Sequence, residues 1–228
     1  MHALQKFIVR NQQLCISSDR SIFWEDEKCL IVSDLHFGKT GHFRKEGIAV
    51  PQFVFRQDMQ RLVSQIQFFK PDRLIVVGDM FHSNANKELD LFARWRKDFG
   101  DLHIDLVRGN HDILQKKWYV EQNIVVHEDS LTMSPFCFQH DPGSCSGGTT
   151  PPTYVFSGHI HPGVTFNGVG KQSLRFPCFY FTETYCVLPA FSHFTGFVSV
   201  HQSPREVVFA IINNSLVIVG EEKLKAGI

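Results

Sequence analysis

Residue types that bind metal ions recur in this sequence directly after short apolar runs. Asp34 and His36 follow the run Leu30–Val32, and Asp79 follows the run Leu74–Val77. Further along the chain, the same construction supplies Asn110 with His111, then His140, then His159 with His161. Carboxylate, amide and imidazole groups are ligands of divalent metal ions. The chemistry that these residues could support together is therefore metal binding in one cleft.

The order of the whole set carries this prediction, because a lone histidine is more often a surface or hydrogen-bonded residue than a metal ligand. Gly-Asn-His-Asp at 109–112 and Gly-His-x-His at 158–161 are the more specific motifs. Glycine permits a tight turn there, while the polar side chains beside it face one way. Five such groups in succession, each after an apolar run, predict a shared site.

The elements that must position these residues are buried strands. Leu30–Val32 and Leu74–Val77 are aliphatic without polar alternation, which is typical of strands covered on both faces, and Ile104–Val107 is predicted to form a third strand. Open α/β sheets bind ligands beyond the carboxyl ends of their strands, where these polar groups stand. Amphipathic helices are predicted between the strands, over 51–70 and 87–99. This alternation indicates a βαβ sheet.

The second half of the chain is predicted to be mostly strands. The strand-like runs are Ile124–His127, Leu131–Ser134, Phe136–His140, Tyr154–Ser157, Val164–Phe166, Phe179–Phe181, Tyr185–Leu188, Phe197–Val200 and Val207–Ile212. A hairpin of Gln5–Arg10 and Leu14–Ser17 is expected to precede the first core strand. The Gly, Ser and Pro residues of 141–152 predict a loop beside His140. Candidate metal-binding residues occur both in the α/β first half and in the strand-rich second half. The chain is therefore interpreted as one domain, 1–228.

The overall composition narrows the function classes. With 23 basic and 23 acidic residues, the 228-residue chain has no overall field that would attract a polyanion. This weighs against a protein that coats nucleic acid, but not against an enzyme that meets phosphate at a metal ion. No run approaches the roughly 20 apolar residues of a membrane span, so no membrane partner is expected. The six cysteines lack zinc-ribbon spacing, and mostly buried thiols in the cytoplasm are expected.

The ordered blocks resemble the signature of the calcineurin-like metallophosphoesterase superfamily. They read Asp34-Leu35-His36, Gly78-Asp79, Gly109-Asn110-His111-Asp112, His140 and Gly158-His159-Ile160-His161. The flanks, among them Phe37-Gly38-Lys39, Phe81-His82-Ser83, Leu174-Arg175-Phe176-Pro177 and Leu188-Pro189-Ala190-Phe191, are similar to small bacterial DNA-ligase-associated metallophosphoesterases, often described as DNA-damage-response endonucleases. The resemblance implies an α/β fold: a four-layer α/β/β/α sandwich of two mixed sheets.

The resemblance also implies two divalent metal ions, about 3.5–4 Å apart, that share Asp79 as a bridge. Asp34, His36 and His161 would complete one metal site, and Asn110, His140 and His159 would complete the other. Mixed nitrogen and oxygen ligation suits Mn²⁺, with Fe or Zn²⁺ as alternatives, better than Ca²⁺. The metal pair would lower the pKa of a shared water and supply a bridging hydroxide as the nucleophile.

Catalytic roles are implied for Asp34 and Asp79 at the metals and for His111 beside them. His111 would not bind metal. It would protonate the leaving alkoxide or hydrogen-bond a non-bridging oxygen, oriented by Asp34 or Asp112. Substrate contacts are expected from His82, Arg44 and Arg175.

The function expected from this resemblance is hydrolysis of a phosphodiester, with DNA as the substrate of an endo- or exonuclease. A DNA ligase or a helicase would be its functional partner in repair. Two alternatives stay open from the sequence: a phosphoesterase acting on cyclic nucleotides or nucleotide pyrophosphates, and a non-catalytic scaffold with the same fold. Such scaffolds typically lose ligands, whereas every ligand position is filled here. The sequence leaves the oligomeric state open.

Overall fold

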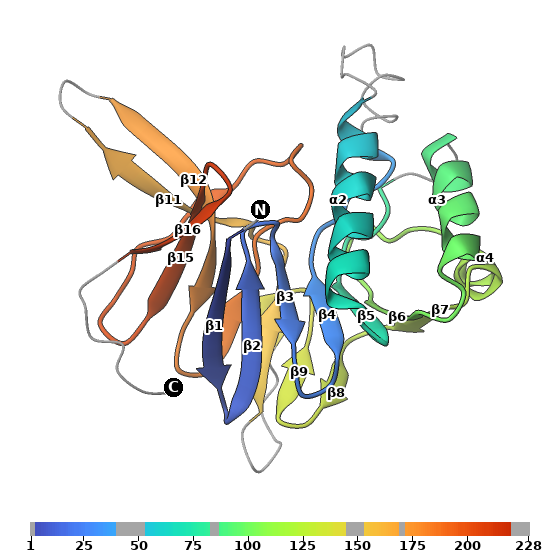
Figure 1. The fold of residues 1–228 in the computed structure, drawn as a ribbon, viewed down its shortest axis with the longest axis horizontal. Helices are drawn as coiled ribbons and strands as arrows, with labels where there is room; N and C mark the ends of the chain where they lie inside the picture. Colours follow the sequence, from blue (N-terminus) through green and yellow to red (C-terminus); the bar gives the residue numbers. More distant parts are fainter. Residues whose placement is uncertain (1–2, 40–52, 83–86, 145–152, 169–171, 220–228) are drawn as a thin grey trace.

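The computed structural model describes residues 3–39, 53–82, 87–144, 153–168 and 172–219. Within these ranges, one sheet contains seven strands in chain order (Figure 1). They are β1 (Leu4–Val9), β2 (Gln12–Ser17), β3 (Ser21–Trp24), β4 (Cys29–Val32), β5 (Arg73–Val77), β6 (His103–Val107) and β7 (Ile124–His127). The strands β1 to β4 are antiparallel neighbours, and β4 to β7 are parallel ones.

The described helices connect or follow the parallel strands. Helix α2 (Phe53–Phe69) precedes β5, α3 (Lys87–Asp98) precedes β6, and α4 (Lys116–Glu121) precedes β7. Parallel neighbours need crossover connections of this kind, because a tight turn can join only antiparallel strands. The carboxyl ends of β4, β5 and β6 consequently lie at one edge of the sheet.

The second sheet is built from the later strands. They are β8 (Leu131–Met133), β9 (Phe136–Phe138), β10 (Tyr154–Ser157), β11 (Pro162–Asn167), β12 (Ser173–Phe181), β13 (Tyr185–Val187), β14 (Val198–Ser199), β15 (Val207–Ile212) and β16 (Ser215–Val219), with the short 3₁₀ turn η1 (Pro142–Ser144) after β9. Within the described ranges the order is β14-β11-β12-β13-β10-β9-β8, and β15 joins β12 and β16. Because β9, β10 and β13 are parallel while their neighbours are antiparallel, this sheet is mixed.

The two sheets pack face to face. Successive side chains of β4 point to opposite faces of the first sheet, so this strand contributes to two hydrophobic cores. Cys29 and Ile31 face the second sheet, whereas Leu30 and Val32 face the helices. The inter-sheet core is rich in aromatic side chains; for example, Trp24 packs edge-on against Phe136 with ring centroids 4.6 Å apart. The other core joins the first sheet to α2, α3 and α4. The predicted pair of mixed sheets is therefore confirmed.

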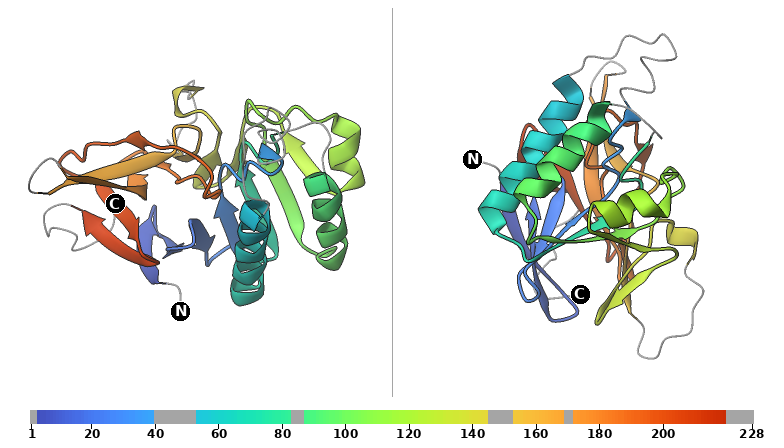
Figure 2. Two further views of the ribbon diagram at one scale, coloured as in Figure 1. Left: turned by 90° about the horizontal axis from the view of Figure 1, so that it is seen from above. Right: turned by 90° about the vertical axis from the view of Figure 1, so that its right-hand side faces the viewer.

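The predicted helical layer on the second sheet has no counterpart among the described residues. Figures 1 and 2 show α2, α3 and α4 together on the outer side of the first sheet. The described segments between the strands of the second sheet contain the 3₁₀ turn η1 but no α-helix. A small apolar cluster around Val164, Cys178, Val208 and Ala210 lies apart from the inter-sheet core.

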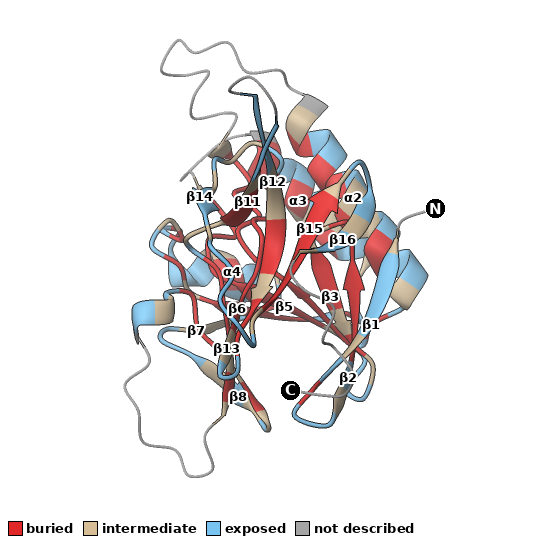
Figure 3. Ribbon diagram, turned by 90° about the vertical axis from the view of Figure 1, so that its left-hand side faces the viewer, coloured by how far each residue is buried: buried red, intermediate tan, exposed pale blue. Residues whose placement is uncertain are grey.

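Figure 3 shows where the molecule is buried and exposed. Buried residues follow the strands that face each other, while β1, the end of β11 and the start of β12 are exposed. In the part of the chain that the structure describes, no helix is long and apolar enough to cross a membrane. Cys15, Cys29, Cys178 and Cys186 are buried free thiols, as expected from their sequence setting.

The predicted strand bounds are correct for Ile124–His127, Tyr154–Ser157 and Val207–Ile212. Two strands were missing from the sequence prediction, β3 and β16. Strand β16 lies at a sheet edge, and β3 is only four residues long. The predicted 141–152 loop is described only as far as η1, and its remaining part lies outside the described residues.

Candidate metal centre

The strand ends bring the sequence-predicted residues together where the two sheets meet. Asp34 and His36 follow β4, and Asp79 follows β5. Asn110 and His111 follow β6, His140 follows β9, and His159 and His161 follow β10. Three of these strands are parallel neighbours in the first sheet and two are parallel neighbours in the second. Their carboxyl ends therefore deliver all eight side chains to one edge of the sandwich.

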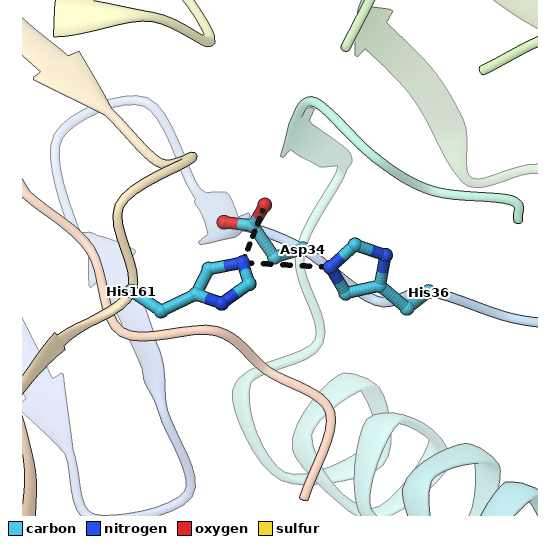
Figure 4. A group of neighbouring side chains, drawn as sticks. All are labelled: Asp34, His36 and His161. Carbon is cyan, nitrogen blue, oxygen red and sulfur yellow. Dashed lines mark hydrogen bonds and ion pairs between the residues drawn. The ribbon is translucent and has the colours of Figure 1, made fainter. Parts of the chain in front are cut away.

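The first group consists of Asp34, His36 and His161, whose ligand atoms all lie within 4.8 Å of one another. Figure 4 shows the His161 ring pointing toward both other side chains. His161 Nε2 is 3.2 Å from Asp34 Oδ1 and 3.4 Å from His36 Nε2. Asp34 and His36 are buried, whereas His161 is partly exposed, so the group opens to solvent on the His161 side.

The second group surrounds the His140 ring. His140 Nε2 lies 3.5 Å from Asp79 Oδ2, 3.2 Å from Asn110 Oδ1 and 3.2 Å from His159 Nδ1. Asp79 Oδ2 is also 4.0 Å from His36 Nε2, so this carboxylate stands between the two groups. Asp34, Asp79 and His140 likewise place ligand atoms within 4.8 Å of one another. The geometry therefore joins the two groups through Asp79, as the resemblance implies.

The atoms that converge at the first group fit a cation. His161 Nδ1 donates its proton to the carbonyl oxygen of Gly196 at 3.2 Å, which leaves Nε2 of the neutral ring with a lone pair. That lone pair faces a carboxylate oxygen and another imidazole nitrogen. Asp34 Oδ1 is buried and accepts no hydrogen bond from the described residues. Such an inward-facing set of acceptors is stabilised when a cation binds between them.

The charges of the second group lead to the same conclusion. Burial lowers the pKa of His140, but its hydrogen bond with Asp79 and the charges of Asp34 and Asp79 outweigh burial and raise that pKa to about 9. Burial disfavours the charged form of Asp79, yet the His140 contact holds the pKa of this carboxyl below its usual range. Burial lowers the pKa of His36 to about 3. Without an ion, Asp79 and His140 thus stabilise each other's charged forms, and a divalent ion could take the place of the His140 charge beside Asp79.

Five of the predicted site residues share the same unusual backbone conformation. Asp34, His36, Asp79, His159 and His161 all have φ between 49° and 69°. This left-handed region costs a non-glycine residue about 1–3 kcal/mol and is typical of functional sites. In both Asp-x-His and His-x-His, the two outer residues adopt it, so each pair turns its side chains into the same cleft. The sequence had shown the spacing of these pairs but not this conformation.

Glycine lets the second sheet approach the first at the site. A Cβ at Gly158 would overlap Ser33 Oγ, lie 2.5 Å from Asp34 Oδ2 and lie 3.0 Å from Val77 O. Ser33 Oγ itself bonds Asp34 Oδ2 and donates to Val77 O, so it has little room to move. Only glycine therefore permits the close packing that brings His159 beside Asp34, whose Oδ2 accepts from His159 N at 3.2 Å.

Replacing Gly158 with alanine is expected to displace Asp34 and to weaken Mn²⁺ binding at least ~10-fold. The measurement is equilibrium binding of Mn²⁺ to the ion-free protein, with circular dichroism to verify folding. The matched control is Gly100→Ala, at the end of α3, where the nearest atom to an added Cβ is 3.9 Å away. Unchanged Mn²⁺ affinity in a folded Gly158→Ala variant would contradict this interpretation.

His111 lies beside the two groups. Its backbone N–H donates to Asp79 Oδ1 at 2.8 Å, and its ring centroid is 5.5 Å from that of His36. The predicted substrate residue His82 stacks against it, with ring centroids 4.2 Å apart. Asp112 stabilises the local turn, because its carboxylate oxygens accept hydrogen bonds from Gly109 N at 2.9 Å and Phe81 N at 3.0 Å. The carboxylate is thus used by these backbone groups and not by the His111 ring.

Of the two arginines predicted to bind substrate, neither is placed at the centre by a described contact. Arg44 lies outside the described residues. Arg175 is exposed on β12, opposite Thr165 in the β11–β12 hairpin. Lys39 is nearer the site: burial lowers the pKa of its amine, which the charges of Asp79 and Asp34 raise. The roles of the two arginines stay predictions.

Sequence reasoning missed a second set of buried polar residues, Arg20, Asp58 and Arg61. They hold the segment after β13 against β4 and α2. Asp58 and Arg61 are three residues apart in a helix, which in sequence is typical of a solvated ion pair. The sequence contained no signal that would have distinguished them.

The two-sheet sandwich gathers aspartate, histidine and asparagine side chains at its strand ends, and Asp34, His36, Asp79 and His140 among them are buried. The model of the calcineurin-like phosphoesterase family matches residues 28–178. The chain belongs to this family, whose members bind two divalent metal ions, and it is a phosphoesterase. The comparison with curated proteins gave no match.

Among solved structures, this chain is similar to the nuclease MPE of Pseudomonas putida, with 28% sequence identity and a TM-score of 0.76. That alignment covers 91% of this chain and 96% of the Pseudomonas chain. YfcE, a phosphoesterase from E. coli, is 13% identical with a TM-score of 0.44, over 84% of this chain and 97% of its own.

Proposed function

We propose that the protein is a nuclease that hydrolyses phosphodiester bonds of DNA with two divalent metal ions. We expect Mn²⁺ to be the metal that gives the highest activity. The observation that carries the proposal is the complete set of converging side chains, five of them on a left-handed backbone. A nuclease activity is supported by the 28% identity to the Pseudomonas putida nuclease over 91% of this chain, and DNA is chosen as the substrate because the sequence resemblance implies it. A DNA ligase or helicase would then be its functional partner, as the sequence resemblance implies.

The side chains divide the work of holding the ions. Asp34, His36 and His161 would bind one ion, and Asn110, His140 and His159 would bind the other, with Asp79 between them. When bound, the ion pair supplies an activated water and neutralises charge on the phosphate. Imidazole and carboxylate ligands together suit Mn²⁺, Fe or Zn²⁺ better than Ca²⁺.

The remaining residues act on the substrate. His111 would protonate the leaving oxygen or hydrogen-bond a non-bridging oxygen, and the hydrogen bond from its backbone to Asp79 supports this role by fixing its position. His82 packs against the His111 ring and limits the directions in which it can turn. Lys39 carries a charge that interacts with Asp34 and Asp79 and is placed to meet a phosphate oxygen.

A second candidate is hydrolysis of small phosphoesters such as 2′,3′-cyclic nucleotides. It is favoured by the balanced charge of the chain, 23 basic and 23 acidic residues, which provides no overall attraction for a long polyanion. The metal centre would work in the same way on either substrate. The two candidates therefore differ in what binds around the centre, not in its chemistry.

A substrate screen with Mn²⁺ tests the proposal. Linear single-stranded, nicked and duplex DNA are compared with 2′,3′-cyclic nucleotides and with an aryl phosphodiester as a general reporter. We expect cleavage of the reporter and of at least one DNA form. Cleavage of the cyclic nucleotides without any DNA would reject the nuclease assignment, and an inert reporter would reject the phosphodiesterase mechanism.

A further inference from the structure

The segment 190–196, here called the strap, lies directly against the candidate metal centre. It follows β13 and crosses the end of β4. Phe191 N donates to the carbonyl oxygen of Ser33 at 2.7 Å, and Ser192 N donates to that of Asp34 at 3.2 Å. The strap therefore extends the hydrogen bonding of β4 over the left-handed backbone of Asp34. Its position and that of Asp34 are coupled.

Two arginines bind three consecutive carbonyl groups of the strap. Arg20 Nη1 donates to Ala190 O at 3.0 Å and to Ser192 O at 2.6 Å. Arg61 Nη2 donates to the carbonyl between them, that of Phe191, and to Asp58 Oδ1 at 2.9 Å. The Arg61 guanidinium also lies 4.2 Å from the centre of the Phe191 ring, a cation–π contact. A planar guanidinium can hold these partners together, because its donors form a fixed fork.

Burying this cluster of charged side chains costs free energy of folding. The Arg61 and Asp58 side chains are only 9% and 3% exposed. Burial and the charge of Arg61 lower the pKa of Arg20 to about 9, so the two cations destabilise each other. Buried ion clusters of this kind contribute little net stability compared with apolar packing. Their physical effect is to fix a geometry, and the geometry fixed here is that of the strap.

The far end of the strap reaches the first metal group. The carbonyl oxygen of Gly196 accepts the Nδ1 proton of His161 at 3.2 Å. Between this carbonyl and the arginines, Ser192 Oγ accepts from Phe194 N at 3.2 Å, and Thr195 Oγ1 donates to Ser192 O at 3.2 Å. These bonds leave little freedom between the clamped carbonyls and Gly196. The strap thus determines which nitrogen of His161 carries the proton and which faces Asp34.

We infer that Arg61 is a positioning residue, which holds the strap so that Gly196 orients His161, and Ser192 supports Asp34, for metal binding. The inference rests on the proposed metal centre but concerns residues that no ligand would touch. Arg20 acts in the same way on the neighbouring carbonyl groups. In the ion-free protein, His161 should therefore already be held as the Nδ1–H tautomer.

Two measurements on Arg61→Met test this inference. The first is equilibrium binding of Mn²⁺, expected to be 10–100-fold weaker, the usual effect of losing support behind a metal ligand. The second is the ¹⁵N resonances of the His161 ring in the ion-free protein, expected to change from one tautomer to a mixture. Methionine keeps the length and packing of the side chain but donates no hydrogen bond. Arg205→Met is the matched control, because Arg205 is exposed and forms a surface ion pair with Glu183, away from the strap.

The outcomes separate this inference from the proposed function. Unchanged Mn²⁺ affinity and unchanged His161 resonances in Arg61→Met would overturn the role of Arg61. A wild-type protein that binds no Mn²⁺ would overturn the metal centre, and the ¹⁵N comparison would still decide the role of Arg61. If Arg61→Met does not fold, Ser192→Ala removes one internal strap bond, and we expect several-fold weaker Mn²⁺ binding. Arg61→Lys should recover part of the affinity, because one ammonium can reach fewer of the partners.

Discussion

Asp79→Asn should abolish measurable phosphodiesterase activity. Asp79 is the carboxylate between the two groups, with Oδ2 3.5 Å from His140 Nε2 and 4.0 Å from His36 Nε2. Asparagine keeps the size of the side chain but removes the charge. Its amide would either turn N–H donors toward ligand nitrogens or leave a neutral oxygen between two cations. A loss of at least ~10³-fold in kcat/KM is expected, equivalent to about 4 kcal/mol at the transition state.

The measurement combines kinetics with metal analysis. Hydrolysis of an aryl phosphodiester in Mn²⁺ is followed beside the metal content of the protein, which should fall in Asp79→Asn. Asp72→Asn is the matched control, because Asp72 is exposed and pairs with Lys28 at 3.7 Å, before the start of β5. Full activity in Asp79→Asn would exclude Asp79 as the bridge and with it the two-metal mechanism proposed for this chain.

The sequence predicted the strand ends of the site because both parts of the signal are local. An apolar run predicts a buried strand, and the polar residues directly after it must leave at the strand end. Asp34 and His161 are far apart in the sequence, yet each could be placed at a strand end from its own neighbours. Their pairing at 3.2 Å depends on how two sheets pack, which no local pattern contains. For this part, the resemblance to a family supplied what periodicity could not.

The support around the site could not be predicted, for a physical reason. Arg61 and Asp58 are on a helix, at a spacing typical of an exposed pair, and Arg20 is in a turn. Only the return of residues 190–196 across β4 buries them, and that contact joins positions about 130 residues apart. The composition of the strap, with Ser, His, Thr and Gly, is typical of an exposed loop. Polar residues buried by distant segments are therefore the part of this fold that sequence patterns miss.

The helical layer predicted over the second sheet is another feature that local sequence patterns could not decide. The sequence correctly indicated helices in the first half and strands in the second. A helix–sheet–sheet–helix order was then inferred from the family resemblance. In the described residues, the helices all pack on the first sheet, where they connect its parallel strands. Local patterns predicted which elements form, while the number of layers depends on how they connect.

His111→Ala is expected to lower kcat 10²–10⁴-fold while leaving Mn²⁺ binding and protein stability nearly unchanged. The His111 ring lies 5.5 Å from that of His36 and is held by the backbone bond to Asp79, but it is not among the converging ligand atoms. Alanine keeps that backbone bond and removes only the imidazole. His201→Ala is the matched control, because His201 is exposed and lies outside the site.

The leaving group decides between the two roles proposed for His111. A nitrophenolate departs without needing a proton, whereas an alkoxide, such as the one released from DNA, needs a general acid. If His111 donates this proton, the loss in His111→Ala should be larger for a substrate with an alkyl leaving group than for the nitrophenyl ester. If His111 instead binds a non-bridging oxygen, both substrates should lose the same factor, because that contact does not involve the leaving group. Equal losses would therefore assign His111 to the phosphate oxygen, and an undiminished kcat with both substrates would remove it from the mechanism.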